Sequence, residues 1–474
     1  MVSYKDPTET FEIKQSFLKE GLPKLKDGKT RWIVLFFSCI TAIGPLYCIG
    51  LPVVLQHALM DALEIHEVFQ YNVIHTVYAV PNFILPFFGG VLVDRLGLRL
   101  SYIIFVAVAL VGQAILTFGV ANRSFILMLV GRSIFSIGGD SLIIAKSTML
   151  SKWFMGKELA FALGIGLGAT RIGSSLNSLF SAKIFDWTGS LGLPFLIGTG
   201  ICFLSFISVF SLNILDKKAD EQEDNQEEDD DDGEPLGAFN LRVVKKLKPI
   251  YYYLTGHFVP LYAVTFVFIQ NLSHLLEVRF GFSDGDAGQF MAIIFGSSIV
   301  TAPFFGWFID KKGKKGLIMI FAALFFLGTH AYIAFIPDAR SGERSYYVVG
   351  GLISVGIFLS LYSAIYWPCV ALIVPRRYMG VAYGLSLAGF NLMLSIIPLA
   401  IGKIHDLTTN INHGYFWTEV LLMGITGFGV IFTILAYIED IRKGKRKLDK
   451  PSAFNHEIDT SISESADTSS ISIA

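Results

Sequence analysis

Charged residues and cysteines are scarce in this sequence of 474 residues. Asp, Glu, Lys and Arg together make up 16% of the chain, where about 25% is usual in soluble proteins. The formal net charge of −1 leaves no basic excess that would attract a nucleic-acid backbone. The 4 cysteines lie in apolar runs, which argues against a disulfide framework or a metal-binding knuckle. These absences exclude an ordinary soluble enzyme and a nucleic-acid-binding protein, and we expect no metal and no cofactor.

Hydrophobic residues, in contrast, make up 53% of the chain. A membrane-spanning helix needs about 20 predominantly apolar residues, and twelve runs of about this length can be recognised. They are Trp32–Gln56, Tyr71–Val93, Leu100–Val120, Phe125–Ala145, Leu159–Ala182, Leu193–Leu215, Pro249–Asn271, Ala287–Ile309, Leu317–Ile336, Tyr346–Leu372, Val381–Gly402 and Tyr415–Ile438. The sequence therefore predicts an all-α polytopic membrane protein with twelve transmembrane helices.

Lys and Arg residues in the short loops predict how the chain is oriented. One set of loops and both tails are rich in basic residues, whereas the opposite set holds only a few: Arg123, Arg279, Arg340 and Arg344. By the positive-inside rule, the basic set is cytoplasmic. Both termini are therefore predicted to be cytoplasmic, which agrees with an even number of spans.

Composition also divides the chain into five parts. The predicted parts are a cytoplasmic N-terminal tail (1–31), a six-helix half (32–215), an acidic and then basic cytoplasmic linker (216–248), a second six-helix half (249–438) and a disordered cytoplasmic tail (439–474). The acidic stretch is most simply a solvated, self-repelling linker.

An internal repeat relates the two predicted halves. Residues 90–97 (GVLVDRLG) and 306–313 (GWFIDKKG) share the pattern G-x-x-x-D-[RK]-x-G at a spacing of 216 residues. A second echo is KIFD at 183–186 against KIHD at 403–406, 220 residues apart. One six-helix unit has therefore been used twice. Parallel repeats of this kind build transporters whose halves rock around a site near the membrane midplane.

The repeated loop resembles the signature of the major facilitator superfamily, and the resemblance covers essentially the whole chain. It implies two pseudo-symmetric six-helix halves and a gating role for the loop residues, because a carboxylate at a helix end with basic neighbours can make contacts in only one conformer. The predicted gating residues are Gly90, Asp94, Arg95, Gly97, Gly306, Asp310, Lys311 and Gly313. The alternative is a topology signal with a solvated aspartate. Gly131 and Arg132 match a second motif only in part, so no proton-coupling role is carried onto Arg132.

Two ionisable residues lie deep inside predicted spans, Asp140 in the fourth and Arg171 in the fifth. A charge at mid-bilayer costs about 2.5–3.5 kcal/mol on insertion scales, so each requires a reason. At 1.5 Å per residue, Asp140 lies about 15 Å and Arg171 about 20 Å from the cytoplasmic end. Three interpretations are open: the two neutralise each other, they bind the ends of a zwitterion in a central cavity, or Asp140 relays protons.

Longer strings resemble the lysosomal dipeptide transporters within this superfamily. The most specific are 153–159 (WFMGKEL) and 169–174 (ATRIGS), with 138–141 (GGDS) among the weaker ones. The resemblance implies transport of dipeptides across the lysosomal membrane to the cytosol as a uniporter, with Asp140 and Arg171 holding the two ends of the substrate. Those transporters carry Glu at the Asp140 position, one methylene longer. The resemblance also implies a glycosylated lysosomal membrane protein as an accessory subunit, beside the lipid bilayer as surroundings.

Weaker candidates for the substrate cavity are polar or aromatic residues within spans. The best of them are Tyr78, Asn82, Trp367 and Asn391, the last of which aligns with Arg171 at the spacing of 220. The plainer interpretation of each is an interhelical hydrogen bond or an interface anchor. Open alternatives for the whole chain are a porter of another small organic anion or metabolite, a non-transporting membrane sensor, and location in the plasma membrane or another endomembrane.

Overall fold

The computed structural model describes residues 28–85, 96–154, 159–223, 244–340, 343–375, 378–409, 412–443 and 446–449. Every regular element within these residues is a helix. The first half contains α2 (Thr30–Ile49), α3 (Leu51–Val54), α4 (Gln56–Ala62), α5 (Val68–Ile84), α7 (Leu98–Ala121), α8 (Phe125–Phe154), α9 (Leu159–Thr188) and α10 (Gly192–Glu223). The second contains α12 (Pro249–Gln270), α13 (Leu272–Phe280), α14 (Asp284–Lys312), α15 (Lys315–Phe335), α16 (Val348–Ile373), α17 (Met379–Leu407), η2 (Asn412–Gly414), α18 (Tyr415–Arg442) and η3 (Lys447–Asp449).

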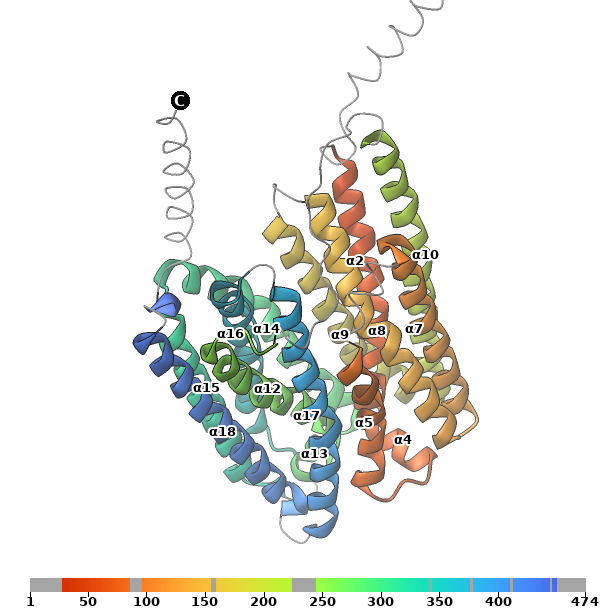
Figure 1. Cartoon of the computed structure of the whole chain (residues 1–474). Coiled ribbons are helices and arrows are strands. Elements are labelled where there is room, and N and C mark those ends of the chain that lie inside the picture. Colours follow the sequence, from red (N-terminus) through yellow and green to blue (C-terminus); the bar gives the residue numbers. More distant parts are fainter. Residues whose placement is uncertain are drawn as a thin grey trace, which may run out of the picture.

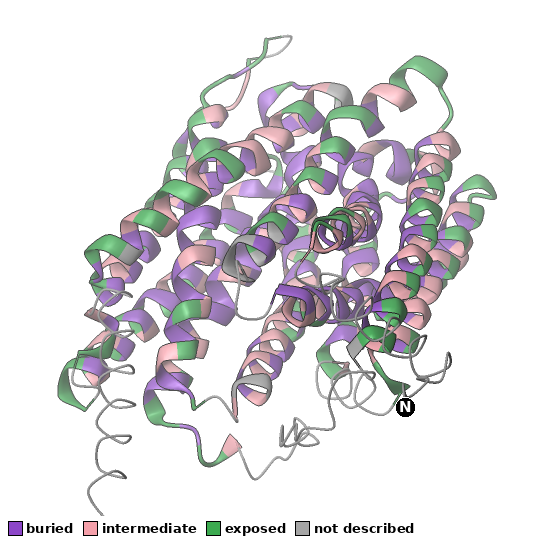
Figure 2. Cartoon of the chain, turned by 90° about the horizontal axis from the view of Figure 1, so that it is seen from above, coloured by how far each residue is buried: buried purple, intermediate pink, exposed green. Residues whose placement is uncertain are grey.

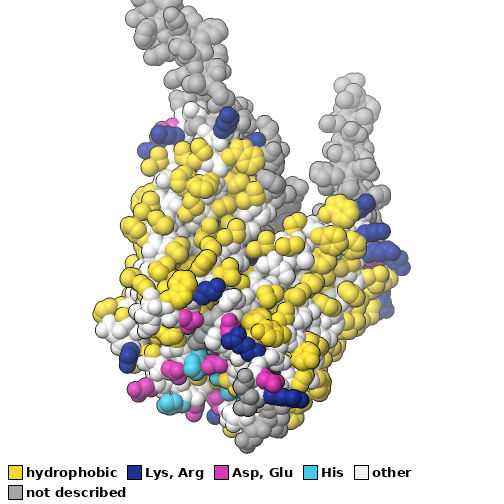
Figure 3. All heavy atoms as spheres, turned by 180° about the vertical axis from the view of Figure 1, so that it is seen from behind, with side chains coloured by type: hydrophobic (Ala, Val, Ile, Leu, Met, Phe, Trp, Pro, Cys, Tyr) yellow, Lys and Arg dark blue, Asp and Glu magenta, His cyan; other side chains and the backbone are white. Residues whose placement is uncertain are grey.

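Among the described residues, ten helices are long and apolar enough to cross a membrane. They correspond to ten of the twelve predicted spans, and α5 and α9 occupy the places of the second and fifth. Apolar side chains cover the outer face of the molecule, as Figure 3 shows for one side. Phe118, Ile126, Phe321 and Phe335, for example, are each more than 60% exposed. An all-α polytopic membrane fold is therefore confirmed.

The two halves lie side by side and approach each other unequally along their length. In Figure 1 they converge at the end that holds α4 and α13, called here the far end, and diverge toward the end where α10 finishes, called here the tail end. The contacts between halves are made chiefly by α5 with α17 and by α9 with α14. Viewed from above, buried residues lie where helices face one another and exposed ones lie outside (Figure 2).

Two helices extend beyond their predicted ends at the tail end. α8 continues from Ala145 to Phe154, and α10 continues past Leu215 to Glu223. The buried carboxylate of Asp216 explains the extension of α10, because it accepts hydrogen bonds from Trp153 Nε1 at 2.9 Å and Arg99 Nε at 2.7 Å. Asp216, the charged residue that ends the apolar run in the sequence, is therefore hydrogen-bonded to other helices of the first half and does not end α10.

Candidate functional site

Asp140 lies on α8 beside glycines that bring this helix close to α7. A Cβ atom on Gly138 would lie 2.3 Å from the Phe105 carbonyl oxygen of α7, so only glycine fits there. The Asp140 side chain is half-buried. It accepts a hydrogen bond of 2.6 Å from the Tyr78 hydroxyl of α5. The structure therefore brings together two of the residues that the sequence predicts for the substrate site.

Arg132 lies on the other side of Tyr78, two turns before Asp140 on α8. Its guanidinium carbon is 4.8 Å from the centroid of the Tyr78 ring, within cation–π range. The same guanidinium donates to the carbonyl oxygens of Cys48 at 3.4 Å and Ile49 at 2.8 Å. These two carbonyl groups lie at the end of α2. The helical donor to the Cys48 carbonyl oxygen would be the N–H of residue 52, but this residue is a proline and has no N–H. Sequence reasoning gave Arg132 no role, although the partial motif at Gly131 and Arg132 was a signal for it.

Arg171 lies on α9 and reaches into the second half. Its Nη2 donates to the Ser363 hydroxyl of α16 at 3.4 Å, and its buried Nη1 has no hydrogen-bond partner. Tyr262 of α12 interacts electrostatically with the same guanidinium. Among the described residues, Arg171 and Asp140 form no ion pair with each other; each has the hydrogen-bond partner named above. Asp140 thus has a hydroxyl as its hydrogen-bond partner, with the charge of Arg132 nearby on the same helix, and Arg171 has a hydroxyl partner.

Of the three remaining candidates, the two asparagines each donate to a carbonyl oxygen of their own helix, whereas Trp367 packs against another aromatic ring. Asn82, 1% exposed, donates weakly to the Tyr78 carbonyl oxygen at 3.4 Å. Asn391 donates to the Leu387 carbonyl oxygen of its own helix at 3.1 Å. The buried Oδ1 atoms of both asparagines have no hydrogen-bond partner. Trp367 packs edge-on against Phe258, with ring centroids 5.4 Å apart.

Trp367 belongs to an aromatic cluster between α12, α16 and α17, whose assembly was not predicted from the sequence. The cluster consists of Phe258, Tyr262, Tyr362, Tyr366, Trp367 and Phe390. Its tightest pair is Phe258 and Tyr366, stacked at 3.9 Å. The buried hydroxyl of Tyr362 has no hydrogen-bond partner. Aromatic residues spaced four apart on both α12 and α16 were the available signal, because such residues share one helix face.

The predicted gating residues can be followed only in part. Gly90, Asp94 and Arg95 lie outside the described residues. Gly97 precedes α7 with a positive φ of 78°, and Gly313 follows α14 with a φ of 62°, a conformation that favours glycine.

In the second loop, Gly306, Asp310 and Lys311 occupy the last turns of α14 at the tail end. No neighbouring atom lies within 4 Å of a Cβ placed on Gly306. The Lys311 ammonium lies 5.0 Å above the Trp307 ring of the same helix. The gating role of these residues stays a prediction.

The fold and the paired halves define a polytopic membrane transporter. Residues 31–398 match the model of the Major Facilitator Superfamily, so the chain belongs to this superfamily. The solved structure of a mutant of the nucleoside transporter NupG is similar, with a TM-score of 0.63 and 14% identity over 85% of this chain and 98% of that chain. At that identity, the likeness concerns the fold alone. The fold and relatives are those of transporters, not of an enzyme family.

Curated relatives narrow the comparison further. The lysosomal dipeptide transporter MFSD1 of Homo sapiens is 30% identical over 438 residues, which cover 90% of each chain. The protein of the same name from Danio rerio is 30% identical, over 87% of this chain and 88% of the relative. A hexuronate transporter of Bacillus subtilis is 25% identical, over 79% of this chain and 86% of the relative.

Proposed function

We propose that this chain transports dipeptides, with Asp140 and Arg171 as the two anchors for the substrate termini. The observation that carries the proposal is that these two charges do not neutralise each other, although they lie on neighbouring helices. Asp140 is bonded to Tyr78 and Arg171 to Ser363, both neutral. A zwitterion could engage both groups: its ammonium would pair with the carboxylate, and its carboxylate would accept from the unpartnered Nη1.

The neighbours of each anchor are suited to holding it ready. The Tyr78 hydroxyl uses one lone pair of the Asp140 carboxylate and leaves the others for an ammonium group. Ser363 fixes one arm of Arg171 and leaves the second arm to donate to a carboxylate. Restricting both side chains before binding lowers the entropy cost of the complex. The aromatic cluster around Trp367 lies in the second half and would contact substrate side chains through ring faces and edges.

We infer that transport proceeds by alternating access without an obligatory coupled ion, which makes the protein a uniporter. The halves touch at the far end through α5 with α17 and α9 with α14, so the described conformation corresponds to one closed at that end. With the tail end in the cytoplasm, this is a conformer that releases substrate inward. The relatives support the lysosomal membrane as the location, and an accessory subunit is consistent with that location.

Modified dipeptides test each anchor separately. The measurement is the rise in melting temperature of the purified full chain with a free dipeptide, its N-acetyl form and its C-terminal amide. The N-acetyl form lacks the ammonium, so it should stabilise wild type weakly and Asp140→Asn equally weakly. The amide lacks the carboxylate and should likewise fail to distinguish wild type from Arg171→Ala. The free dipeptide should stabilise only wild type.

Matched controls are Asp61→Asn and Lys217→Ala, which remove charges that are 71% and 69% exposed. Both should respond to the free dipeptide as wild type does. Stabilisation of wild type by a hexuronate or another monovalent organic anion, with no response to dipeptides, would refute the proposal. That result would instead favour a porter of organic anions, in which Arg171 alone could bind the substrate carboxylate. The similarity to a hexuronate transporter is consistent with this alternative.

A further inference from the structure

One sequence repeat has no place in the proposed substrate site. The Lys-Ile-x-Asp strings at 183–186 and 403–406 close α9 and α17, respectively, in the two halves. Both helices end at the far end, where α9 meets α14 and α17 meets α5. Each aspartate therefore stands where one half touches the other, at the opposite end of the helices from the G-x-x-x-D-[RK]-x-G loops.

Asp406 caps a helix of the other half. Its Oδ1 accepts the backbone N–H of Val68 and its Oδ2 that of Phe69, both at 3.0 Å. These groups open α5, and the first N–H groups of a helix have no partner within the helix. The residue before α5, Glu67, makes no side-chain cap. The cap thus comes from a residue 338 positions away, and its negative charge also complements the positive end of the helix dipole.

The contact continues along the α5–α17 interface. A Cβ atom on Gly402 would lie 2.4 Å from Phe69 Cα, so the two backbones touch there. One turn further, Asn72 Nδ2 donates to the Pro398 carbonyl oxygen at 2.8 Å. A turn beyond it, the Thr76 hydroxyl donates to the backbone carbonyl oxygen of Ser395 at 3.1 Å. All of these bonds join the halves, so all must break before the far end can open.

The α9–α14 interface is related by the repeat but is held differently. A Cβ atom on Gly288 would lie 2.4 Å from the Ser178 carbonyl oxygen, which shows the same backbone contact. Asp186, however, experiences electrostatic repulsion from the like charge of Asp286. No hydrogen bond joins Asp186 to α14 among those of the described residues, and α14 is capped by its own Ser283.

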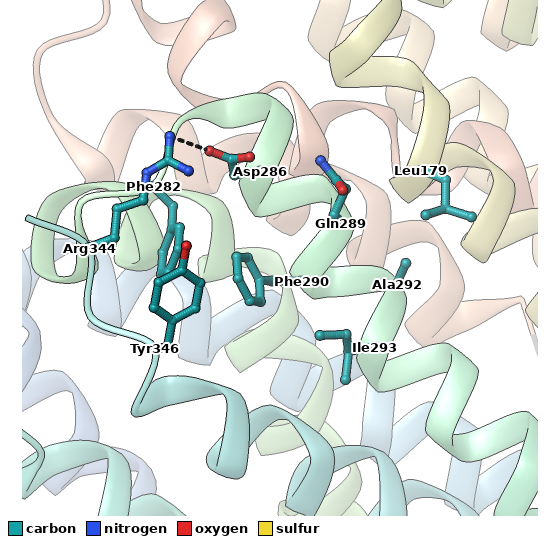
Figure 4. Close-up of a pocket in the computed structure, with 9 residues that line it drawn as sticks. All are labelled: Leu179, Phe282, Asp286, Gln289, Phe290, Ala292, Ile293, Arg344 and Tyr346. Carbon is teal, nitrogen blue, oxygen red and sulfur yellow. Dashed lines mark ion pairs between the residues drawn. The ribbon is translucent and has the colours of Figure 1, made fainter.

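Asp286 is neutralised from its own half, by Arg344 at 3.0 Å. In Figure 4 this ion pair stands at the rim of a pocket of about 570 Å³, with Leu179 of α9 on the far wall. Within the described part of the chain, the α9–α14 interface therefore shows no counterpart to the hydrogen bonds that the Asp406 carboxylate makes across the α5–α17 interface.

We propose that Asp406 is the latch that keeps the far end closed, and that Asp186, its counterpart in the repeat, has lost that role. The carboxylate holds two backbone N–H groups of α5 and must release them in each transport cycle. The inference rests on the alternating access proposed above. In this proposal, the Lys-Ile-x-Asp string at 403–406 would control closure of the far end. The G-x-x-x-D-[RK]-x-G loops, with their predicted gating role, would control closure of the tail end.

The test is the distance between the halves at the far end, measured by double electron–electron resonance. Spin labels are placed on Glu67→Cys and Thr409→Cys, both exposed positions beside the latch, after replacement of the 4 native cysteines by alanine. The full chain without substrate is measured in lipid nanodiscs. The parent protein should show one short distance. Asp406→Ala should add a longer distance and lower the ratio of closed to open molecules at least tenfold.

Two further variants complete the design. Asp406→Asn retains one acceptor oxygen, so it should shift the ratio less than Asp406→Ala, and it carries the test where the alanine variant does not fold. Asp186→Asn is the matched control and should leave the distance unchanged. An unchanged distance in both folded Asp406 variants, or an equal shift in Asp186→Asn, overturns the latch. The distance measurement contains no substrate, so its result does not depend on which substrate is transported. If dipeptides fail to raise the melting temperature of the same proteins in a separate measurement, the proposed substrate is refuted and the latch is unaffected.

Discussion

Tyr78 donates a hydrogen bond of 2.6 Å to Asp140 across the contact between α5 and α8. The same tyrosine ring covers Arg132, and the guanidinium in turn binds the last carbonyl oxygens of α2. Three helices of the first half are thus linked through one buried ring. The arrangement ties the direction of the Asp140 carboxylate to the packing of its half, so a rearrangement of α5 would be felt at the anchor.

Replacing Tyr78 by phenylalanine should weaken dipeptide binding without unfolding the protein. The ring and its contact with Arg132 stay, whereas Asp140 loses a hydrogen bond to a charged group, of a kind that contributes about 1.5–3 kcal/mol. Because the carboxylate is then no longer held in place before binding, ordering it adds to the free-energy cost of the complex, and we expect affinity to fall about three- to tenfold, or roughly 0.7–1.4 kcal/mol. Isothermal titration calorimetry with a dipeptide measures this affinity. The control is Tyr102→Phe, which removes another buried hydroxyl, bonded to Thr41, and should bind the dipeptide as wild type does. A wild-type affinity of Tyr78→Phe would contradict the role of Tyr78 in positioning Asp140.

Arg132 should matter for stability through the end of α2 rather than through substrate contact. Arg132→Lys keeps the charge but cannot span both carbonyl oxygens, since an ammonium lacks the fork geometry. Leaving a buried acceptor unsatisfied costs about 1–3 kcal/mol, so the melting temperature should fall by several degrees. Binding of the free dipeptide, measured below that temperature, should change little. A large loss of affinity at unchanged stability would place Arg132 in the substrate site instead.

The fold was predictable from the sequence because the bilayer imposes a length on every span. Ten predicted spans reappear as helices that meet the length and composition of a spanning segment. The ends of the helices were less predictable. A charged residue marks the end of a span only when its side chain is in water, whereas Asp216 is hydrogen-bonded to Arg99 and Trp153. The repeat predicted two related halves, but not that their far ends are closed while the tail ends diverge.

The candidate substrate site, whose role stays a prediction, was indicated by the sequence to the extent that isolated charges in apolar runs require a reason. Asp140 and Arg171 were found in this way. Their partners Tyr78 and Ser363 belong to other helices, and helix packing decides which of many in-span hydroxyls reaches a given charge. The role of Asp406 could not be derived, because its partner is a pair of backbone N–H groups that have no signature in the sequence.

His274, which lies beyond the α12 span, should make the protein less stable in acid. Burial, together with the nearby His405, His57 and His413, lowers the pKa of His274 to about 3. Between pH 6.5 and 3 the unfolded chain therefore binds a proton that the folded chain does not, and stability falls as pH falls. The limiting slope for one group is about 1.4 kcal/mol per pH unit.

The check is the melting temperature of wild type and His274→Gln at pH 7.0 and 4.5. The variant should lose less on acidification than wild type, because its side chain does not titrate. His66→Gln, an exposed position at the same end of the molecule, is the control and should behave as wild type. Equal acid sensitivity of wild type and His274→Gln would assign the titration to another group.

His330 and Glu419 form a buried pair between α15 and α18, with Nδ1 and Oε2 2.7 Å apart and exposures of 0% and 1%. Removing one partner of such a pair leaves a buried polar group alone and costs about 3–5 kcal/mol, whereas replacing both by apolar residues is often neutral. We therefore expect His330→Leu and Glu419→Leu each to lower the melting temperature strongly, and the double variant to recover most of the loss. The melting curves of wild type and the three variants form a double-mutant cycle. Strictly additive losses would show that the two side chains act independently, and full recovery with intact dipeptide stabilisation would show that the pair is structural and has no part in transport.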